Sequence, residues 1–336
     1  ASNNTALGFE ALATNSTGAS NVAVGHNALD ANTTASNNTA VGKDALTANT
    51  TGANNTALGK AALYTNTGSG DNTAIGFQAL YTSAGARNTA LGHNALFNNT
   101  TADNNVAVGK DALEANTTGA NNTAVGYQAM AANTTADGNT CLGYAAGDDI
   151  TTGSHNTVIG NLNDAGGSGS AYRVVMGYSA SGGSNDSFLV GRGTTDSQIA
   201  FGETSITAPS DIRLKEDIQD EEVGLDFINE LRPVTFLWKK EKDIPSDMKA
   251  HKEDSEERTM NGKYNHGFVA QEVKEVIDKY DLKEGFEMWT EDETDGRQRI
   301  GESALIPMLV KSIQELSAEV EQLKQKAHDK CDNNGE

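Results

Sequence analysis

Asn38-Thr39-Ala40-Val41-Gly42 and Asn122-Thr123-Ala124-Val125-Gly126 are two copies of a short core that recurs through the first three-fifths of the chain. Its glycine returns every 17 residues, apart from one gap of 16 before Gly92 and one of 14 before Gly191. A period this regular indicates one small structural unit that is copied and stacked, rather than a globular enzyme domain. The twelve glycines are Gly8, Gly25, Gly42, Gly59, Gly76, Gly92, Gly109, Gly126, Gly143, Gly160, Gly177 and Gly191.

The unit predicts a mostly β fold. Seventeen residues are too few for the helix pairs of common helical repeats, and the Asn, Thr and Gly content disfavours helix. No proline precedes Pro209, so every amide before it can donate to a ladder. We therefore expect a parallel β-solenoid (β-roll) of about twelve 17-residue repeats, with a regular shaft or head over 1–160 and degenerate repeats and a neck over 161–209. One such coil has a thin core, so association with other chains is expected.

Alternation along the core strand predicts which side chains lie inside the coil. Val22 and Val106 stand where most copies have threonine, so the face shared by this column and Val41 is expected to point inward. The small residue between them, Ala40 in its copy, is then expected outside, close to a turn or a second chain. A second strand is expected at the leucine that follows each core: Leu12, Leu29, Leu46, Leu63, Leu80, Leu96 and Leu113.

The repeat resembles the head repeats of trimeric adhesins of the YadA type. Those heads carry an Asn-Ser-Val-Ala-Ile-Gly-like core in a left-handed parallel β-roll shared by three subunits, and Asn-Thr-Ala-Val-Gly fills the place of that core here. The period is longer in this chain, and threonine stands where the family prefers valine. The resemblance implies a homotrimer.

Net charge excludes two classes of partner. Residues 1–209 hold 14 acids and 6 bases and residues 210–336 hold 32 and 19, which gives −8 and −13 of the total −21. Neither part has the basic clusters that nucleic acid or an anionic membrane surface requires. The sequence shows no apolar run of membrane-spanning length and no signal peptide. Ala1 begins inside a repeat, so we expect a fragment of a longer chain.

Cysteine and histidine predict no cofactor and no metal site. The two cysteines, Cys141 and Cys331, make no disulfide framework, and the six histidines show no ligand spacing. Cys141 stands in the alanine column, which favours a structural role for a small residue over a reactive thiol.

The second half of the chain has its own composition and ends in a helix. All four prolines and both tryptophans lie from Pro209 onward. Apolar residues spaced alternately by three and four predict a coiled coil over about 303–327, whereas the alternative is one amphipathic helix packed on its own domain. On helix rules alone the seam favours a dimer, and the resemblance of the repeats argues for three chains. The seam consists of Ile306, Leu309, Ile313, Leu316, Val320, Leu323 and Ala327.

Three ordered motifs resemble the peptidase S74 family, the intramolecular chaperone domains of phage tail fibres, tailspikes and endosialidases. They are Ser210-Asp211-Ile212-Arg213-Leu214-Lys215, then Leu231-Arg232-Pro233-Val234-Thr235-Phe236-Leu237-Trp238, then Gly267-Phe268-Val269-Ala270-Gln271-Glu272-Val273. With the terminal heptad helix they cover about 203–330. The resemblance implies a small α+β domain over 210–336 that trimerises, assists folding of the upstream β-structure and then cuts itself off.

The implied chemistry is a single autoproteolytic cut between Pro209 and Ser210, with no multi-turnover activity in the repeats. Matched to the family, Ser210 is the nucleophile and Lys215 its general base, since a serine hydroxyl needs a base and lysine acts as one only when neutral. The supporting positions near this dyad are Asp211, Arg213, His266 and Gln271.

The resulting prediction is a tail-fibre or adhesin fragment of the virion that attaches to a host cell-surface glycan or protein. The alternatives are a glycan depolymerase tailspike, a trimeric adhesin on a bacterial surface, and ice binding by aligned threonines. A depolymerase needs two carboxylates at a set separation, and the acids of the repeat occupy variable turn positions. Val22 and Val106 in the strand's threonine column count against ice binding by that column, because they indicate that it points inward. The Thr50/Thr51 and Thr117/Thr118 columns stay open as candidates.

Overall fold

The computed structural model describes residues 1–182, 184–193, 195–202, 215–246, 248, 250–260, 262–282, 288–291 and 298–332. The chain forms two compact units, Ala1–Leu214 and Lys215–Glu336.

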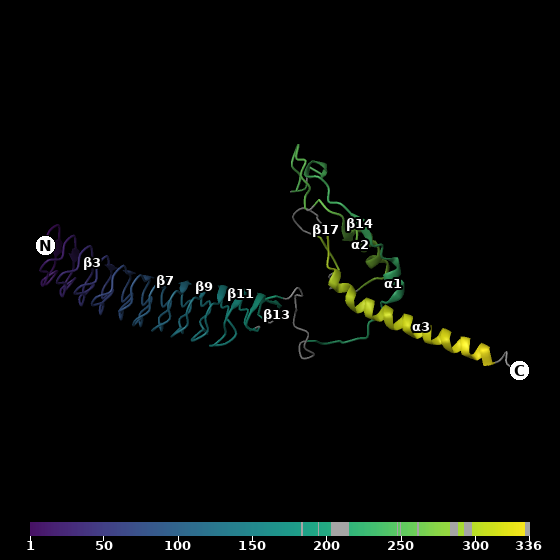
Figure 1. Ribbon diagram of the computed structural model, residues 1–336, viewed down its shortest axis with the longest axis horizontal. Helices are drawn as coiled ribbons and strands as arrows, with labels where there is room; N and C mark the ends of the chain where they lie inside the picture. The colour runs from purple at the N-terminus through teal and green to yellow at the C-terminus, as the bar shows by residue number, and fades with distance from the viewer. Residues whose placement is uncertain are drawn as a thin grey trace. The chain divides into compact units, whose positions relative to one another are not determined.

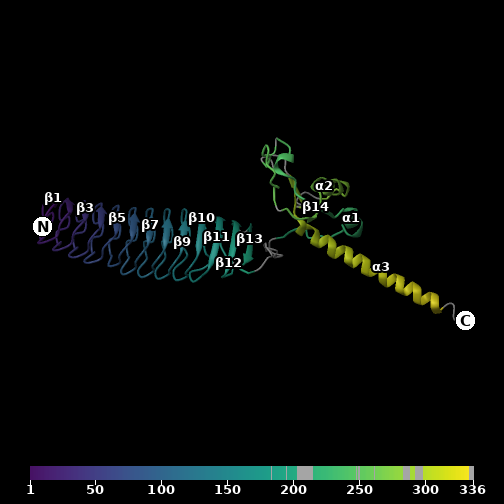
Figure 2. The ribbon, with the colours of Figure 1, turned by 45° about the horizontal axis from the view of Figure 1, so that its top comes forward.

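The first unit is a parallel β-solenoid of about eleven turns, as the repeat predicts (Figures 1 and 2). Each coil contributes one short strand, and each strand pairs in register with the strand one repeat further on, as Thr39 does with Thr56. The strands of the regular coils are β1 (Thr5–Leu7), β2 (Val22–Val24), β3 (Thr39–Val41), β4 (Thr56–Leu58), β5 (Thr73–Ile75), β6 (Thr89–Leu91), β7 (Val106–Val108), β8 (Thr123–Val125) and β9 (Thr140–Leu142).

The recurring glycine follows from how closely the coils stack. Gly42 has a φ of 136°, and a Cβ added there would lie 2.6 Å from the carbonyl oxygen of Gly59 in the next coil. A side chain therefore meets both a strained backbone and a collision at this position. The same closeness recurs at each repeat, which explains why the glycine spacing is constant.

The predicted inside and outside faces of the core strand are reversed in the structure. From Ala23 to Ala124 the alanines equivalent to Ala40 are fully buried within the coil, whereas Leu58 is 47 % exposed and Leu142 is 48 % exposed. The threonine column shares the outward face, so Val22 and Val106 do not show that it points inward. The inward position of the strand is alanine in β2 to β8, where the buried leucine or methionine of the following turn fills the interior, and it is Cys141, Val158, Val175 and Leu189 in the next four parallel strands.

The second strand is also absent from the described coils, and that prediction is wrong. Leu46 lies in a turn with a φ of 50°, two residues after Asp44 with a φ of 59°. These leucines still form the main apolar filling of the interior, with Leu29, Leu46, Leu63, Leu80, Leu96 and Leu113 all fully buried. Leucine rarely adopts a left-handed backbone, and here its burial and the bond from its N–H to the next coil hold it there (Leu46 N to Ala62 O, 3.0 Å).

Two buried columns of asparagine join the coils. In the first column Asn38 Nδ2 donates to the Gly52 carbonyl, and its Oδ1 accepts from the N–H of Asn55, each at 2.9 Å. Buried polar groups are tolerated only when they are hydrogen-bonded, and this column satisfies both ends of each amide. Its fully buried members include Asn21, Asn38, Asn55, Asn72, Asn88, Asn105 and Asn122.

The second asparagine column is interrupted twice. Asn49 Nδ2 donates to the Asn32 Oδ1 at 3.2 Å, and this pattern repeats from coil to coil. The column reads Ser83 and Ile150 where asparagine is expected, and the preceding amides, Asn66 and Asn133, each keep a buried Oδ1 without a hydrogen-bond partner. Hydrogen bonds thus offset most of the free-energy cost of burying these asparagines, except at the two breaks.

The ladder continues after the sequence repeat weakens. The strands β10 (Thr157–Asn161), β11 (Arg173–Tyr178) and β12 (Ser187–Arg192) are longer but still parallel, and Gly160, Gly177 and Gly191 stay in register. The last strand, β13 (Thr195–Ala200), turns back and pairs antiparallel with β12. The parallel stack of the described residues therefore ends at β12.

The second unit is a small α+β domain around one core. Its elements are α1 (Leu225–Glu230), β14 (Val234–Phe236), the 3₁₀ turn η2 (Glu241–Asp243), β15 (Asn265–Gly267), α2 (Ala270–Lys279), β16 (Trp289–Glu291), β17 (Gln298–Ile300), the 3₁₀ turn η3 (Glu302–Leu305) and α3 (Ile306–Asp332). Both pairs of strands, β14 with β15 and β16 with β17, are antiparallel. The buried core consists of Phe227, Leu231, Val273, Met288, Leu305 and Met308.

The terminal helix α3 packs on this core with its first turns only. Pro307 occupies its second position, where a missing N–H costs nothing. Met308 and Ser312 are buried, whereas Ile313 on the opposite side is 62 % exposed. Every residue of the predicted seam faces solvent in the single chain.

Candidate functional site

The predicted cleavage segment falls largely outside the described residues. Pro209, Ser210, Asp211 and Arg213 all lie in the gap between 202 and 215, so the geometry of the Ser210–Lys215 dyad is not part of the described structure. Lys215 is the first described residue of the second unit and has an exposed side chain.

The second and third motifs of the S74 resemblance come together as one small sheet. Antiparallel pairing of β14 with β15 sets Val234 opposite Gly267 and Thr235 opposite His266. His266 is exposed on this sheet, and its backbone lies in a strand rather than in a loop. Segments about 30 residues apart in the sequence therefore form one local framework.

An ion pair joins the same two motifs. Arg232, just before β14, donates from Nε to the Glu272 carboxylate at 2.9 Å, and its Nη2 bonds the other oxygen. Glu272 lies in the first turn of α2, and hydrogen bonding to the Arg232 guanidinium lowers the pKa of this carboxyl. Both groups are exposed, so the pair orients the helix more than it stabilises the domain.

Gln271 lines a groove that the sequence did not predict. The groove has a volume of about 840 Å³, and one wall is apolar, with Trp238, Ile244 and Met248. Its polar side chains include Gln271, Gln298 and Arg299. His266 and Lys215 are not among its lining residues. Of the two predicted supporting residues that are described, Gln271 lines this groove and His266 does not.

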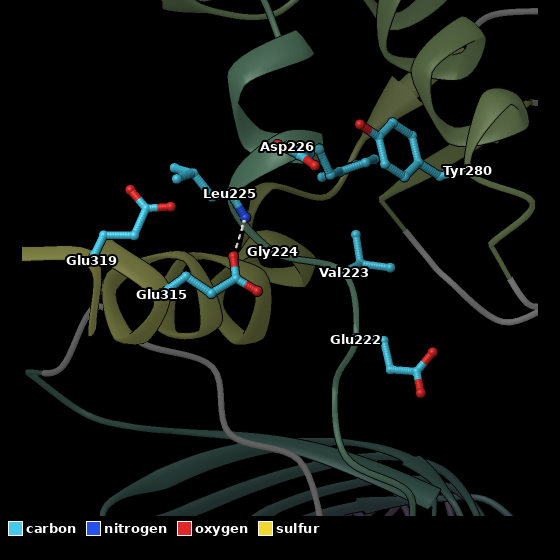
Figure 3. A pocket seen from close by; sticks show the side chains of 9 residues that line it. Glu222, Val223, Gly224, Leu225, Asp226, Tyr280, Glu315 and Glu319 are labelled. Carbon is cyan, nitrogen blue, oxygen red and sulfur yellow. Dashed lines mark hydrogen bonds between the residues drawn. The ribbon is translucent and has the colours of Figure 1, made fainter. Parts of the chain in front are cut away.

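A smaller cavity of about 350 Å³ lies between α1 and α3 (Figure 3). Figure 3 shows Glu315 of α3 reaching the start of α1, where its carboxylate accepts from the Leu225 N–H at 2.8 Å. A Cβ added at Gly224 would lie 2.4 Å from the same carboxylate oxygen, so the Glu315 side chain would have to shift. Glu222, Asp226 and Glu319 complete an acidic lining. The contact between Glu315 and Leu225 acts as a helix cap, because the carboxylate satisfies a free N–H at the start of α1.

The described residues offer no metal-binding group of three or more His, Cys, Asp or Glu side chains. Among the same residues, no helix combines the length and apolar character needed to cross a bilayer.

Residues 210–282, which are 73 of the 336 residues, match the family model described as the chaperone of endosialidase. The C-terminal part of this chain contains a Peptidase S74 domain. The match to this S74 domain starts at Ser210 and runs through the paired β14 and β15 to the end of α2. The S74 domain implies a protein of the trimeric tail-fibre or tailspike type, with its own chaperone.

Nothing among the curated proteins or the solved structures matches this chain. The family match does not reach the repeats, so their likeness to YadA-type heads stays a prediction. Sequence reasoning identified the S74 motifs but missed the Arg232–Glu272 and Leu225–Glu315 contacts. These contacts join residues 40 and 90 positions apart, and no local pattern in one sequence signals them.

Proposed function

We propose that this chain is a fragment of a trimeric tail fibre or adhesin that attaches to a host surface and is folded and then released by its S74 domain. The observation that carries the proposal is the chaperone family match at 210–282, directly after a β-solenoid. The solenoid supplies the attachment shaft or head, and the S74 domain supplies the folding aid.

Release proceeds through one cut between Pro209 and Ser210. Lys215, as the neutral amine, takes the proton of the Ser210 hydroxyl, and the oxygen attacks the Pro209 carbonyl carbon. The C–N bond breaks as the C–O bond forms, and the freed amine of Ser210 takes up a proton. Water then hydrolyses the ester and returns the hydroxyl. Each chain reacts once, and five positions separate the two groups, so a bend or a second subunit brings them together.

Trimerisation is supported by an apolar face on the solenoid. The column after each buried alanine carries Val, Leu, Ile or Met on successive coils, and Leu58, Leu91, Leu142, Met176 and Val190 are among its exposed members. Exposed apolar surface that runs along a whole element marks an interaction site. We assign a second and a third copy of the chain to this face.

The exposed seam of α3 supports the same assembly. Leu309, Ile313 and Leu316 lie on one side of the helix, and all three are exposed in the single chain. A heptad seam without a partner in its own domain is expected to pack against the same seam of other copies. Each unit thus has an exposed apolar surface, and we assign both surfaces to contacts with other copies of this chain.

The outward threonines keep ice binding as a second candidate. Thr39, Thr56 and Thr73 lie in register on an outward sheet face, which removes the argument from the sequence against it. The face cannot serve both uses, because a trimer interface covers it. A chain that stays monomeric in native mass spectrometry and inhibits ice recrystallisation would select this candidate.

Cleavage is tested by the denatured mass of the purified chain. The wild type is expected to give fragments 1–209 and 210–336, whereas Ser210→Ala and Lys215→Ala give one full-length species. Glu216→Ala, which removes a neighbouring charge outside the dyad, is the matched control and is expected to cut. Cutting at the same bond in Ser210→Ala would contradict the mechanism.

The chaperone role is tested by refolding. Intertwined chains unfold over a high barrier, so the stability of the trimer is expected to be kinetic. After melting, uncleaved Ser210→Ala is expected to recover more native trimer than cleaved wild type, as measured by native mass spectrometry. Equal recovery would remove the case for a chaperone while leaving the cut itself untouched.

A further inference from the structure

The second asparagine column is first interrupted in the one shortened regular coil. Gly76 and Gly92 are 16 residues apart instead of 17, and Ser83 stands in this coil where the coils before and after it have Asn66 and Asn99. A serine side chain has two fewer non-hydrogen atoms than an asparagine side chain. Because Ser83 is buried, the break lies inside the solenoid and has less side chain to fill it.

Main-chain hydrogen bonds keep the coils in register on both sides of the break. The Thr65 N–H donates to the Tyr81 carbonyl at 3.1 Å, and the Thr82 N–H donates to the Phe97 carbonyl at 3.0 Å. These bonds stand directly before the column position in each coil. Ser83 therefore lies between the two neighbouring asparagines of the column, as an asparagine does in a regular coil.

Two oxygens at the break are poorly satisfied. The Oδ1 of Asn66 is buried and has no hydrogen-bond partner among the described residues. The Oγ of Ser83 lies 3.5 Å from the Gly85 carbonyl, which is at the outer limit of a hydrogen bond. A buried acceptor without a donor is costly, so this site favours a ligand that can donate to it.

The amide on the other side of the break has a donor to spare. In a complete part of the column, Asn116 Nδ2 donates to the Gly119 carbonyl in its own turn and to the Asn99 Oδ1 in the coil before. Asn99 Nδ2 makes the first kind of bond, to the Ala102 carbonyl at 2.9 Å. Its second proton has no acceptor among the described residues, because the side chain at the preceding column position is the shorter serine.

We propose that the break at Ser83 is a binding site for one buried water molecule, which donates to Asn66 Oδ1, accepts from Asn99 Nδ2 and bonds to Ser83 Oγ. Three bonds are typical of a buried water, and a water takes up about 30 Å³ of liquid volume, which suits the loss of two atoms. The water takes the place of the missing amide. It thereby joins the asparagine column across the shortened coil.

The mixed donors and acceptors select water over a cation. A cation needs oxygen ligands only, and the amide hydrogens of Asn99 would face it. Water donates and accepts at once, so it satisfies the unpaired oxygen of Asn66 and the free proton of Asn99 together.

The second break in the column provides an internal comparison. Asn133 Oδ1 is also buried and unpaired among the described residues, but the next column position holds Ile150, which is fully buried in the solenoid core. An isoleucine side chain has as many non-hydrogen atoms as asparagine and no polar atom. No water is expected there, since the site has neither the room nor the partners.

The test is a high-resolution crystal structure of the wild-type protein. One water is expected within about 2.7–3.2 Å of Asn66 Oδ1, Asn99 Nδ2 and Ser83 Oγ, and none is expected at Asn133 Oδ1. Clear density without a water at Ser83, or a water of equal occupancy at the Ile150 break, would overturn the proposal.

Substitutions at Ser83 give a second measurement. Ser83→Asn is expected to displace the water and to restore direct bonds between amides, as in the neighbouring coils; a water that stays in place would contradict the proposal. Ser83→Val removes a water partner and is expected to lower the midpoint of denaturant unfolding. Thr34→Val, which replaces an exposed hydroxyl in the same way, is the control and should leave the midpoint unchanged. If Ser83→Asn does not fold, the wild-type structure still decides.

Discussion

The solenoid and the S74 domain are stabilised at different ranges along the chain. Each coil bonds to residues about 17 positions away, and the same bonds repeat from β1 to β9. The second unit, which contains most of the S74 match, depends instead on single contacts between distant residues, such as Leu225 with Glu315 and Arg232 with Glu272. Contacts that repeat in every coil leave a periodic pattern in the sequence, and this pattern can be recognised. A contact that is made only once leaves no such pattern.

The two units also use their apolar residues differently. A regular coil buries alanine and one leucine and sends its larger β-branched residues outward. The S74 domain buries Phe227, Val273 and Met308 in the ordinary way. The comparison shows that hydrophobic size predicts burial in the globular core but not along the strands of the regular coils.

The largest expected effect is a charge in the alanine column. Ala74→Asp would bury an unpaired carboxylate in the coil, at a cost of several kcal/mol, so little folded chain is expected in circular dichroism. The neighbouring residue Ile75 faces outward. The Ile75→Asp chain should therefore still fold into the solenoid, but the trimer should be lost in native mass spectrometry. Equal folding of both variants would break the inside–outside comparison.

A smaller loss is expected from the asparagine columns. Asn38→Ala leaves the Asn55 N–H without its partner, at about 1–3 kcal/mol, whereas the Gly52 carbonyl loses one of two donors and keeps Asn49 Nδ2. Asn98→Ala removes an exposed amide next to the buried Asn99, and the free energy of unfolding is expected to change by no more than about 0.5 kcal/mol. Denaturant unfolding of the two variants measures the difference, and similar midpoints would show that the buried columns are not structural.

In the S74 domain the helix cap gives the next effect. Glu315→Ala removes the acceptor of the Leu225 N–H and is expected to cost about 1 kcal/mol, the size of a lost helix cap. Glu319→Ala, from the same cavity lining, should change the melting temperature less. A reversed order would mean that the cavity, rather than the cap, stabilises α1.

The smallest effect is expected from the exposed Arg232–Glu272 pair. Either alanine variant should leave the neutral-pH melting temperature nearly unchanged, because exposed ion pairs are screened. The lowered pKa of Glu272 adds stability that is present above the ordinary glutamate pKa and is lost as pH falls through the folded value. Arg232→Ala should therefore reduce the drop in melting temperature that the wild type shows between pH 6 and pH 3. A large loss at neutral pH would give the pair a role in the fold.

The sequence by itself determined the elements that repeat or follow a period. The glycine spacing gave the solenoid and its register, since only a stack of equal coils needs a residue without a Cβ at each step. The heptad pattern gave α3, and the motifs from Ser210 onward gave the S74 domain that the family match identifies. The dyad of Ser210 and Lys215 and the assembly into three chains stay predictions.

Only the tertiary structure decided which side of each strand is buried and which distant residues meet. Strand alternation is symmetric, so Thr39 with Val41, or Ala40 alone, could equally have faced inward. In the folded coil Ala40 faces inward, where it packs in the same core as Leu46. The cap by Glu315 and the pairing of β14 with β15 likewise arise from folding. Each depends on the distance between residues that the chain keeps apart, and a sequence does not contain that distance.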